Sequence, residues 1–371
     1  MKVLLMGDAS AYHATLARGL VELGHDVTVA SNGGNWMGTA RNIDTSRRRN
    51  KLGGALLWAR LNTLLASKLK GYDVVQLCTP TFVELKPQRI KPLFDRLKRN
   101  NGSICLSVLA TDTQYIRLAA DRSDILRYSE WQVGGEPTPY AQRYSERLRE
   151  WHSHALTDLC QHVYDHVDGV ATALYEYHKV CEQFVPQSKL MYAGIPIDCS
   201  KDVHQSISAD GPLRIMLACH KGREIEKGVD RMLPIVRQFA EDHRGEVEFD
   251  FVQNVPYEQF KQLMDRAHVV VDQLYSYTPA TTALMAMRKG RIVVSGAEKE
   301  YYDFVGEPHP EKVPIINADP ADPNRLYADL EQLLARRSEW AEMGRYGAEF
   351  VKRNNDALIV ARRFEELWQR S

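Results

Sequence analysis

The chain opens on Lys2-Val-Leu-Leu-Met6-Gly7-Asp8-Ala9-Ser10, a short apolar run followed by a turn of small residues. A run of this length and composition is typical of a buried parallel strand. The helical pattern that comes next ends at Gly24, and residues 25–30, His-Asp-Val-Thr-Val-Ala, predict a second strand. Strand, helix and strand in this order form a right-handed βαβ unit, so the start of the chain already predicts a parallel sheet.

The same alternation of strand and helix continues in two blocks of sequence. It recurs through the first half of the chain, is interrupted by a polar excursion at 116–140, and resumes over residues 213–294. Residues 199–212, rich in Ser and ending in Gly-Pro, predict a linker between the two blocks. We therefore predict an α/β fold with two Rossmann-like, doubly wound domains that face each other across a cleft.

The predicted boundaries follow from the linker and from the last helix. The N-terminal domain is predicted at 1–198 and the second domain at 199–353. The final segment, residues 354–371, carries apolar residues at helical spacing, and this stripe must be buried against another part of the protein.

Composition excludes several classes of protein. The chain has 371 residues, with 48 Lys and Arg balanced by 48 Asp and Glu, which argues against nucleic acid as the main partner. No apolar run approaches the roughly 18–20 residues of a membrane span. The six cysteines are scattered without a paired spacing, as is typical of a reducing compartment. We therefore expect a cytoplasmic protein with no transmembrane segment.

The most informative loop is Gly222-Arg223-Glu-Ile-Glu-Lys227-Gly228, which follows an apolar strand and precedes an amphipathic helix. Its position is the carboxyl end of a parallel sheet, where open α/β folds bind ligands. A guanidinium and an ammonium on one loop suit a diphosphate, so Arg223 and Lys227 are candidate phosphate ligands. The alternative is a charged loop that is merely solvated.

A second candidate loop lies between Val269 and Ser295. It reads as strand, hydroxyl-rich loop, short helix and strand, with Thr278 as a predicted N-cap and Pro279 at the first helical position. The amides near 280–282 would then form an anion site at a helix N-terminus. The alternative is a well-capped core helix, and the same helix can be both.

With these stretches the sequence resembles the GT-B glycosyltransferases, in particular the retaining, family-4-like group that uses nucleotide-sugar donors. The resemblance covers the whole chain. It is carried by Leu23-Gly-His-Asp-Val-Thr-Val, Arg223 with Glu226-Lys227-Gly228, Asn254-Val-Pro-Tyr-Glu-Gln-Phe, Val271-Asp-Gln-Leu274, Ala286-Met287 with Gly290, and the C-terminal helix. The resemblance implies that this helix crosses back to the first domain. It also implies that Arg223 and Lys227 hold the donor diphosphate.

One departure from the family pattern concerns the donor sugar. The family usually carries two glutamates in the spacing E-x7-E, which contact the sugar and the ribose, whereas this chain has Tyr277 and Met285 at those positions. We expect the donor contacts to be rebuilt rather than lost. The predicted donor-binding residues are Arg223, Lys227, Asn254, Ser276, Tyr277, Thr278, Thr281 and Thr282.

The first domain should supply the acceptor side. Asp112 follows an apolar strand and is the best candidate for a catalytic base; an N-cap role for the next helix is the alternative. Asp8 and Ser10 lie on the first strand-to-helix loop and are expected to face the cleft, although they too could cap a helix.

Two further patterns have an ordinary explanation. His154, Asp158, His162 and His166 recur every four residues on a predicted helix; a zinc site is chemically allowed, but a polar helix face is the better interpretation. The basic run at 47–51 precedes an apolar helix and could touch anionic lipid, although a loop at the edge of the cleft is favoured.

The sequence thus predicts an enzyme, a glycosyltransferase of hexosyltransferase type, that acts in polysaccharide or glycoconjugate biosynthesis. It would move a sugar from a nucleotide-diphosphate donor to a glycan or lipid-linked acceptor, with retention of configuration. We expect no cofactor and no metal, because Arg223, Lys227 and a helix N-terminus can neutralise the leaving diphosphate. Peripheral membrane contact is the most that is expected. The alternatives are a nucleotide-sugar epimerase and a sugar-nucleotide-binding subunit with impaired catalysis.

Overall fold

The computed structural model describes residues 1–34, 37–146, 149, 153–201 and 203–370. The chain divides into two compact units. Unit 1 comprises residues 1–118, 145–198 and 357–371, and unit 2 comprises residues 119–144 and 199–356.

Unit 1 is built on a parallel sheet of seven strands. They are β1 (Lys2–Met6), β2 (Asp26–Ser31), β3 (Ile43–Asp44), β4 (Val74–Leu77), β5 (Ser103–Val108), β8 (Gly169–Thr172) and β9 (Leu190–Tyr192). Their order is β3-β2-β1-β4-β5-β8-β9, and every neighbouring pair is parallel. The chain reverses its direction of travel between β1 and β4, which makes this the topological switch point of the sheet.

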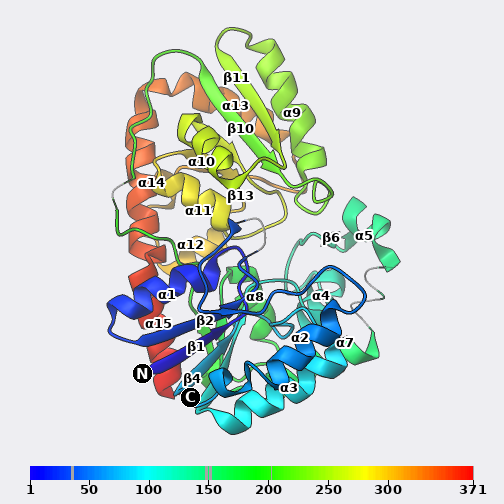
Figure 1. Ribbon diagram of the computed structural model, residues 1–371. Coiled ribbons are helices and arrows are strands. Elements are labelled where there is room, and N and C mark those ends of the chain that lie inside the picture. The colour runs from blue at the N-terminus through cyan, green and yellow to red at the C-terminus, as the bar shows by residue number, and fades with distance from the viewer. Residues whose placement is uncertain (35–36, 147–148, 150–152, 202, 371) are drawn as a thin grey trace. The chain divides into compact units, whose positions relative to one another are not determined.

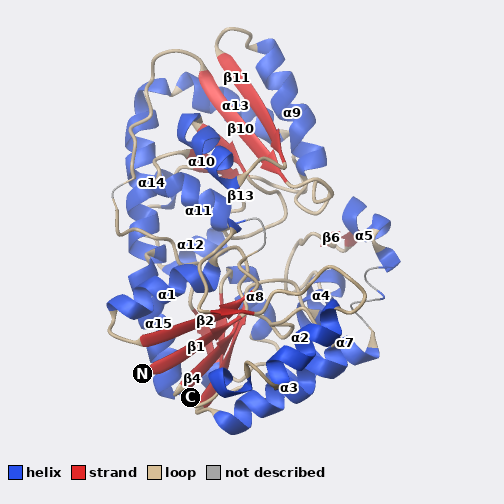
Figure 2. Cartoon of the chain, viewed as in Figure 1, coloured by secondary structure: helices blue, strands red, loops and turns tan. Residues whose placement is uncertain are grey.

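Helices cover both faces of this sheet, as Figures 1 and 2 show. The helices are α1 (Tyr12–Glu22), α2 (Gly53–Asn62), α3 (Pro87–Asn100), α4 (Thr113–Asp121, which runs into unit 2), α7 (His154–His166), α8 (Tyr175–Cys181) and α15 (Ala357–Arg370). Short 3₁₀ turns lie at Ala66–Leu69 and Gln187–Lys189. On one face α2, α3 and α7 bury leucine, isoleucine and valine side chains against β1, β4 and β5 in one continuous core.

The other face of the sheet is covered by α1 and α15. Gly19 of α1 lies so close to α15 that a Cβ atom there would be 2.2 Å from the carbonyl oxygen of Ala357. Phe364 is fully buried, and Trp368 donates its indole N–H to Gln76 Oε1 at 2.9 Å. The apolar stripe of the last helix is therefore buried in unit 1, although the preceding helix belongs to unit 2.

Unit 2 has a second parallel sheet with the same kind of topology. Its strands are β10 (Leu213–Cys219), β11 (Val247–Gln253), β12 (Val269–Val271), β13 (Ile292–Ser295) and β14 (Ile315–Asn317), in the order β11-β10-β12-β13-β14. The helices are α5 (Pro139–Arg143), α9 (Val229–Asp242), α10 (Tyr257–Arg266), α11 (Thr281–Arg288), α12 (Lys299–Val305), α13 (Arg325–Ala335) and α14 (Trp340–Asn355). Two 3₁₀ turns lie at Pro310–Lys312 and Arg337–Glu339. The switch point of this sheet lies between β10 and β12.

The predicted fold class is confirmed: the chain is an α/β protein with two Rossmann-like domains, and its last helix returns to the N-terminal domain. Among the described residues, no helix is both long and apolar enough to cross a bilayer.

The excursion of the first half differs from its predicted place. Its residues 119–144 pack with unit 2 and contain the small hairpin of β6 (Gln132–Val133) and β7 (Glu136–Pro137), whereas the sequence placed them with residues 1–198. The physical reason is a set of aromatic and ionic contacts to the loop after β12, which are described below.

Candidate functional site

The switch point of unit 2 is bridged by an ion pair. Lys227, on the loop after β10, donates from Nζ to Oδ1 of Asp272, which directly follows β12, at 2.8 Å. The Asp272 side chain is 1 % exposed and that of Lys227 20 %. The second oxygen of Asp272, Oδ2, is buried and accepts no hydrogen bond from any described residue. A cation and an acceptor thus lie together where a doubly wound sheet binds its ligand.

The loop after β10 is held in place from two sides. Gly228 has φ +69° and is the N-cap residue of α9, and a Cβ atom there would lie 2.5 Å from Cβ of Leu274. The backbone N–H of Leu274 in turn donates to the carbonyl of Lys227 at 2.9 Å. Glycine is therefore required for this close approach, and the approach fixes the backbone that carries Lys227.

Arg223 lies on the same loop but near its surface. Its Nε and Nη2 donate to the two carboxylate oxygens of Glu226 at 3.0 and 2.5 Å, and its side chain is 51 % exposed. An exposed pair of this kind contributes little to stability. The guanidinium can therefore exchange Glu226 for an anionic ligand at low cost in free energy.

Asn254 connects the neighbouring strand end to this loop. It follows β11, has φ +52°, and accepts a hydrogen bond from the backbone N–H of Lys221 at 3.1 Å. Asn is among the few residues that adopt this left-handed conformation readily, because its side chain can bond locally. Asn254 lies at the carboxyl edge of the sheet, and its observed contact is to the protein backbone. Its predicted role in donor binding stays a prediction.

The loop after β12 is buried over Ser276, Tyr277 and Thr278. The Ser276 hydroxyl donates to the carbonyl of Thr278 at 3.1 Å. Gly296, just after β13, lies against this loop, and a Cβ atom there would be only 1.5 Å from the Ser276 carbonyl oxygen. The loop is consequently clamped by backbone packing.

Helix α11 starts later than predicted. It begins at Thr281 with Ala280 in the N-cap position, so the prediction of Thr278 as N-cap and Pro279 as first helical residue is wrong. Thr278 is instead buried in the clamped loop. Thr281 and Thr282 occupy the first turn and are partly exposed, and the N-cap residue Ala280 makes no side-chain capping hydrogen bond. The N–H groups at this end of the helix retain the geometry that favours an anion.

The excursion at 119–144 is fastened to this loop by a cluster that we call the latch: Arg127, Tyr128, Tyr277 and Glu298. The rings of Tyr128 and Tyr277 stack at 4.4 Å between centroids, with 19° between their planes. The Tyr128 hydroxyl donates to Glu298 Oε1 at 2.7 Å, and Arg127 donates to Glu298 Oε2 at 2.7 Å. The Arg127 guanidinium also lies over the Tyr277 ring, 5.7 Å from its centroid.

Burial in the latch changes the chemistry of Tyr277. It raises the pKa of the phenol to about 12, so Tyr277 is neutral in the physiological range. Its hydroxyl oxygen accepts the backbone N–H of Tyr128 at 3.2 Å. Tyr277, which stands at the first position of the family's E-x7-E spacing, therefore holds the loop after β12 and the segment 119–144 together.

A cavity of about 720 Å³ lies next to the latch, and three latch residues line it. It is bounded by Arg127, Tyr128 and Glu298, by edge strand β14, and by α13. Its volume is in the range of small-molecule sites. None of the predicted donor residues lines it, so it is separate from the edge that carries Lys227.

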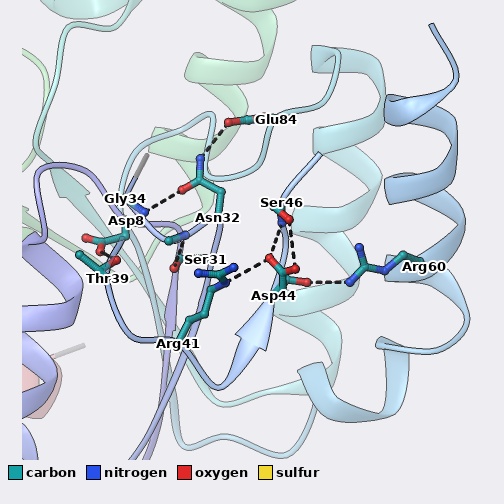
Figure 3. A network of polar contacts seen from close by, with 11 residues as sticks. Asp8, Ser31, Asn32, Gly34, Thr39, Arg41, Asp44, Ser46, Arg60 and Glu84 are labelled. Atoms are coloured by element: carbon teal, nitrogen blue, oxygen red, sulfur yellow. Dashed lines mark hydrogen bonds and ion pairs between the residues drawn. The ribbon is translucent and has the colours of Figure 1, made fainter. Parts of the chain in front are cut away.

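In unit 1 the loop after β1 forms a polar network with the segment after β2 (Figure 3). Asp8 accepts from the backbone N–H of His13 at 3.0 Å and from the Thr39 hydroxyl at 2.8 Å. Asn32 donates to Glu84 Oε1 at 2.8 Å. Ser10 is exposed and has φ +52°, which is uncommon for a residue other than glycine. Asp8 thus accepts a backbone N–H of the first turn of α1, as the capping alternative expected, and a cleft-facing role for Asp8 and Ser10 stays a prediction.

Asp112 precedes α4 and is 3 % exposed. Its Oδ1 accepts the backbone N–H groups of Gln114 and Tyr115, each at 2.9 Å, and its Oδ2 accepts the Tyr164 hydroxyl at 2.6 Å. Burial raises the pKa of Asp112, against the lowering effect of these three donors. The contacts are those of the capping alternative, and a role as catalytic base stays a prediction.

The histidine-rich helix α7 has the polar contacts of a surface helix. His154 contacts Asp158 at 3.0 Å, and His162 contacts Asp95 of α3 at 2.6 Å. Within the described part of the chain, no three His, Cys, Asp or Glu side chains come together in a way that could hold a metal ion.

The fold and this arrangement of loops define a class of protein: two Rossmann-like domains with the GT-B architecture. Sucrose-phosphate synthase from Thermosynechococcus elongatus is 14% identical, with a TM-score of 0.63, over 100% of this chain and 98% of its own. HepE from Anabaena, in complex with UDP-glucose, is 10% identical with a TM-score of 0.61, over 100% and 99%. A UDP-GlcNAc 2-epimerase from Neisseria meningitidis, bound to UDP-GlcNAc, is 10% identical with a TM-score of 0.53, over 100% of each chain.

Identity this low shows a shared fold. No family model matches the chain, and no curated protein matches it in sequence.

Sequence reasoning missed several residues of this site. Asp272 lies within the quoted stretch Val271-Asp-Gln-Leu274, but a single aspartate after a strand does not show that it pairs with Lys227. Tyr128 and Glu298 are 170 positions apart, and nothing local links them. The Ser-Gly pair before Glu298 was the available clue, because a glycine directly after a buried strand often marks a close backbone approach.

Proposed function

We propose that the protein is a glycosyltransferase that binds a nucleotide-diphosphate sugar in unit 2 and transfers the sugar to a glycan or lipid-linked acceptor. The observation that carries the proposal is the bridge between Lys227 and Asp272 at the switch point, with Arg223 on the same loop. The fold is that of proteins crystallised with UDP-sugars, HepE among them. We further propose retention of configuration, hexose transfer and a cytoplasmic role in polysaccharide or glycoconjugate synthesis.

The diphosphate would lie between the loop after β10 and the first turn of α11. Arg223 offers two parallel donors, Lys227 offers a compact charge, and the N–H groups at Thr281 and Thr282 add the positive end of a helix dipole. In the reaction the bond from the anomeric carbon to the diphosphate oxygen breaks and negative charge gathers on that oxygen. Groups already placed around that oxygen stabilise the developing charge without a metal, so we propose metal-independent transfer.

The sugar contacts must differ from those of the family. Tyr277 is occupied in the latch, and Met285 offers no charge, so two carboxylates are absent from their usual positions. Asp272 Oδ2, buried and still able to accept, is the group that we propose for a sugar or ribose hydroxyl. Ser276 and Thr278 would contribute through the clamped loop that they form.

The test uses purified full chain and a thermal-shift panel of UDP, GDP and ADP, their sugars and the corresponding nucleosides. A ligand that binds only the native state raises the melting temperature. We expect one diphosphate and its sugar to raise it and the nucleosides to have little effect. Release of nucleoside diphosphate from the sugar donor in the presence of an acceptor extract, with incorporation of labelled sugar, then shows transfer.

A second candidate function is that of a sugar-nucleotide-binding subunit without transferase activity. The observation in its favour is the pair Tyr277 and Met285 in place of carboxylates, together with an Asp112 whose oxygens are engaged. It predicts the same thermal shifts and no turnover. The epimerase alternative predicts conversion of the free nucleotide sugar into its epimer without any acceptor, which analysis of the recovered sugar detects.

A further inference from the structure

We propose that unit 1 binds an anionic membrane surface through a patch formed by residues 47–52, the outward face of α2, and residues 64–70. We call this the basic-apolar patch. The proposal concerns unit 1 alone and does not depend on what unit 2 binds.

The first observation is a separation of charge. The whole chain is neutral, yet residues 45–72 contain seven Lys and Arg and no Asp or Glu. These cations are Arg47, Arg48, Arg49, Lys51, Arg60, Lys68 and Lys70. All except Arg60 are exposed, and Arg60 donates to the backbone carbonyl of Asp44 at 3.0 Å. A folded surface of mixed charge has no need for such a run, so it points to an anionic partner.

The second observation is that α2 is apolar on both faces. Its inner face buries Leu57 and Leu61 in the core of unit 1. On its outer side Leu52 and Leu56 are 67% and 45% exposed, and Leu64 beyond its end is 73% exposed. These three are among only seven large apolar side chains that are exposed in the described part of the chain. Exposed apolar residues scattered singly are ordinary, whereas a group of them within one short segment marks a contact surface.

The third observation is that the basic loop is folded onto the start of this helix. The backbone N–H of Gly53 donates to the carbonyl of Asn50 at 3.1 Å, and that of Asn50 donates to the carbonyl of Arg48 at 2.9 Å. A Cβ atom at Gly53 would lie 1.9 Å from the Arg48 carbonyl oxygen, so glycine permits the fold. The loop that carries Arg48 is therefore folded onto the first turn of α2, where a Cβ atom at Gly54 would also lie 3.6 Å from the guanidinium carbon of Arg47.

Charge and apolarity together select the partner. Nucleic acid or an acidic protein would use the cations but gain nothing from exposed leucines, and an apolar protein groove would not require six exposed cations. The interface of an anionic bilayer accepts both, with leucines among the acyl chains and cations at the phosphates. Because α2 has only ten residues, this contact is peripheral and reversible.

The test is flotation of the full chain with vesicles of pure phosphatidylcholine and with vesicles containing about 30% phosphatidylglycerol. We expect binding to the anionic vesicles that falls as ionic strength is raised. The variant with Arg47, Arg48 and Arg49 each changed to Gln should bind about a hundredfold more weakly, since each cation at an anionic surface contributes about a factor of five. Leu52→Ser with Leu56→Ser should weaken binding about tenfold or more.

Matched variants elsewhere on the surface serve as controls. Lys299→Gln, Arg325→Gln and Arg345→Gln remove three exposed cations of unit 2, and Val21→Ser removes an exposed apolar side chain of α1. All of them should bind vesicles as the unchanged chain does. The proposal is overturned if the unchanged chain does not prefer anionic vesicles, or if the controls lose as much binding as the patch variants. It is also overturned if the leucine variant keeps full vesicle binding, or if the patch instead joins two copies of the chain, seen as a dimer that the leucine variant dissociates.

Discussion

The two sheets have the same switch-point topology, but different side chains lie at the two switch points. In unit 1, Gly7 after β1 meets Cys78 after β4 so closely that a Cβ atom would lie 2.2 Å from the thiol sulfur. Burial raises the pKa of Cys78 to about 12 and lowers the pKa of the neighbouring His13, so both groups are neutral. In unit 2 the corresponding place holds Lys227 and Asp272. A common backbone therefore does not decide where a charged ligand binds; the loop residues do.

The largest effect that separates the two switch points is expected from Lys227→Met. It would leave Asp272 buried without its cation, which costs about 3–5 kcal/mol of unfolding free energy. Adding Asp272→Leu to the Lys227→Met variant should recover most of the lost unfolding free energy, but it should not recover the binding of diphosphate. Urea unfolding measures both, and Cys78→Ala in unit 1 is the comparison, with a cost of about 1 kcal/mol. Equal losses for Lys227→Met and Cys78→Ala would show that the two sites do not differ in this way.

A second effect comes from a buried histidine of unit 2. Burial, with Arg214, Arg291 and Arg337 nearby, lowers the pKa of His268 to about 4, and its Nδ1 accepts the backbone N–H of Arg214 at 3.1 Å. In the unfolded chain this histidine has a pKa of about 6.5, so below that pH the unfolded chain binds a proton that the folded chain does not. The contribution of the neutral, buried imidazole to the free energy of unfolding is therefore complete above about pH 6.5 and is lost as the pH falls toward 4. We expect a loss of about 2 kcal/mol over this window, smaller in His268→Gln. Unfolding curves at several pH values test it, and an identical slope in the variant would contradict it.

Asp112→Asn distinguishes a cap from a catalytic base in unit 1. The amide keeps an acceptor for the two backbone donors but presents N–H₂ or a neutral oxygen to Tyr164, so we expect a loss of about 1–2 kcal/mol in stability. If Asp112 only caps α4, sugar transfer should stay within a few-fold of the unchanged chain. A fall in kcat of about a hundredfold, measured at a temperature where the variant is still fully folded, would instead identify the base.

The smallest effect concerns the latch. Glu298 accepts from Tyr128 and Arg127 and its side chain is 14% exposed, whereas Glu300 contacts the same arginine at 3.0 Å and is 42% exposed. Glu298→Gln should favour local opening of residues 119–144 by about 1 kcal/mol, and Glu300→Gln by less than about 0.5 kcal/mol. Hydrogen exchange over this segment measures the opening. Equal hydrogen exchange over this segment in the two variants would show that Glu298 does not hold the latch closed.

The alternation of strands and helices was enough to predict both sheets, because a parallel strand must be apolar on both faces and its crossover must be helical. The same logic placed Arg223 and Lys227 at the carboxyl end of one sheet, whereas Asn254 was proposed from the resemblance to the family. It could not assign residues 119–144 to unit 2, because the contacts of Tyr128 with Tyr277 join positions 149 residues apart.

Local rules also failed where backbone packing overrides them. Thr278 followed by Pro279 is a good N-cap sequence. However, Gly296 packs closely against Ser276 and the loop around Thr278 is buried, so α11 begins only at Thr281. For Asp112 the sequence allowed two roles, and it could not show that this carboxylate accepts a hydrogen bond from Tyr164, which lies 52 residues away on α7.

The most direct test of the charged switch point is the affinity of Arg223→Ala for the diphosphate that gives the largest thermal shift, measured by titration calorimetry beside its nucleoside. Arg223 is exposed and pairs with Glu226, so its loss should not unfold unit 2. Arg214→Ala is the matched control: it removes an arginine 48% exposed and paired with Glu248, from the other end of β10. We predict a diphosphate affinity about ten- to a hundredfold weaker for Arg223→Ala, no change for Arg214→Ala, and no effect of either on the nucleoside. Equal diphosphate affinity in the unchanged chain and both variants would contradict the account.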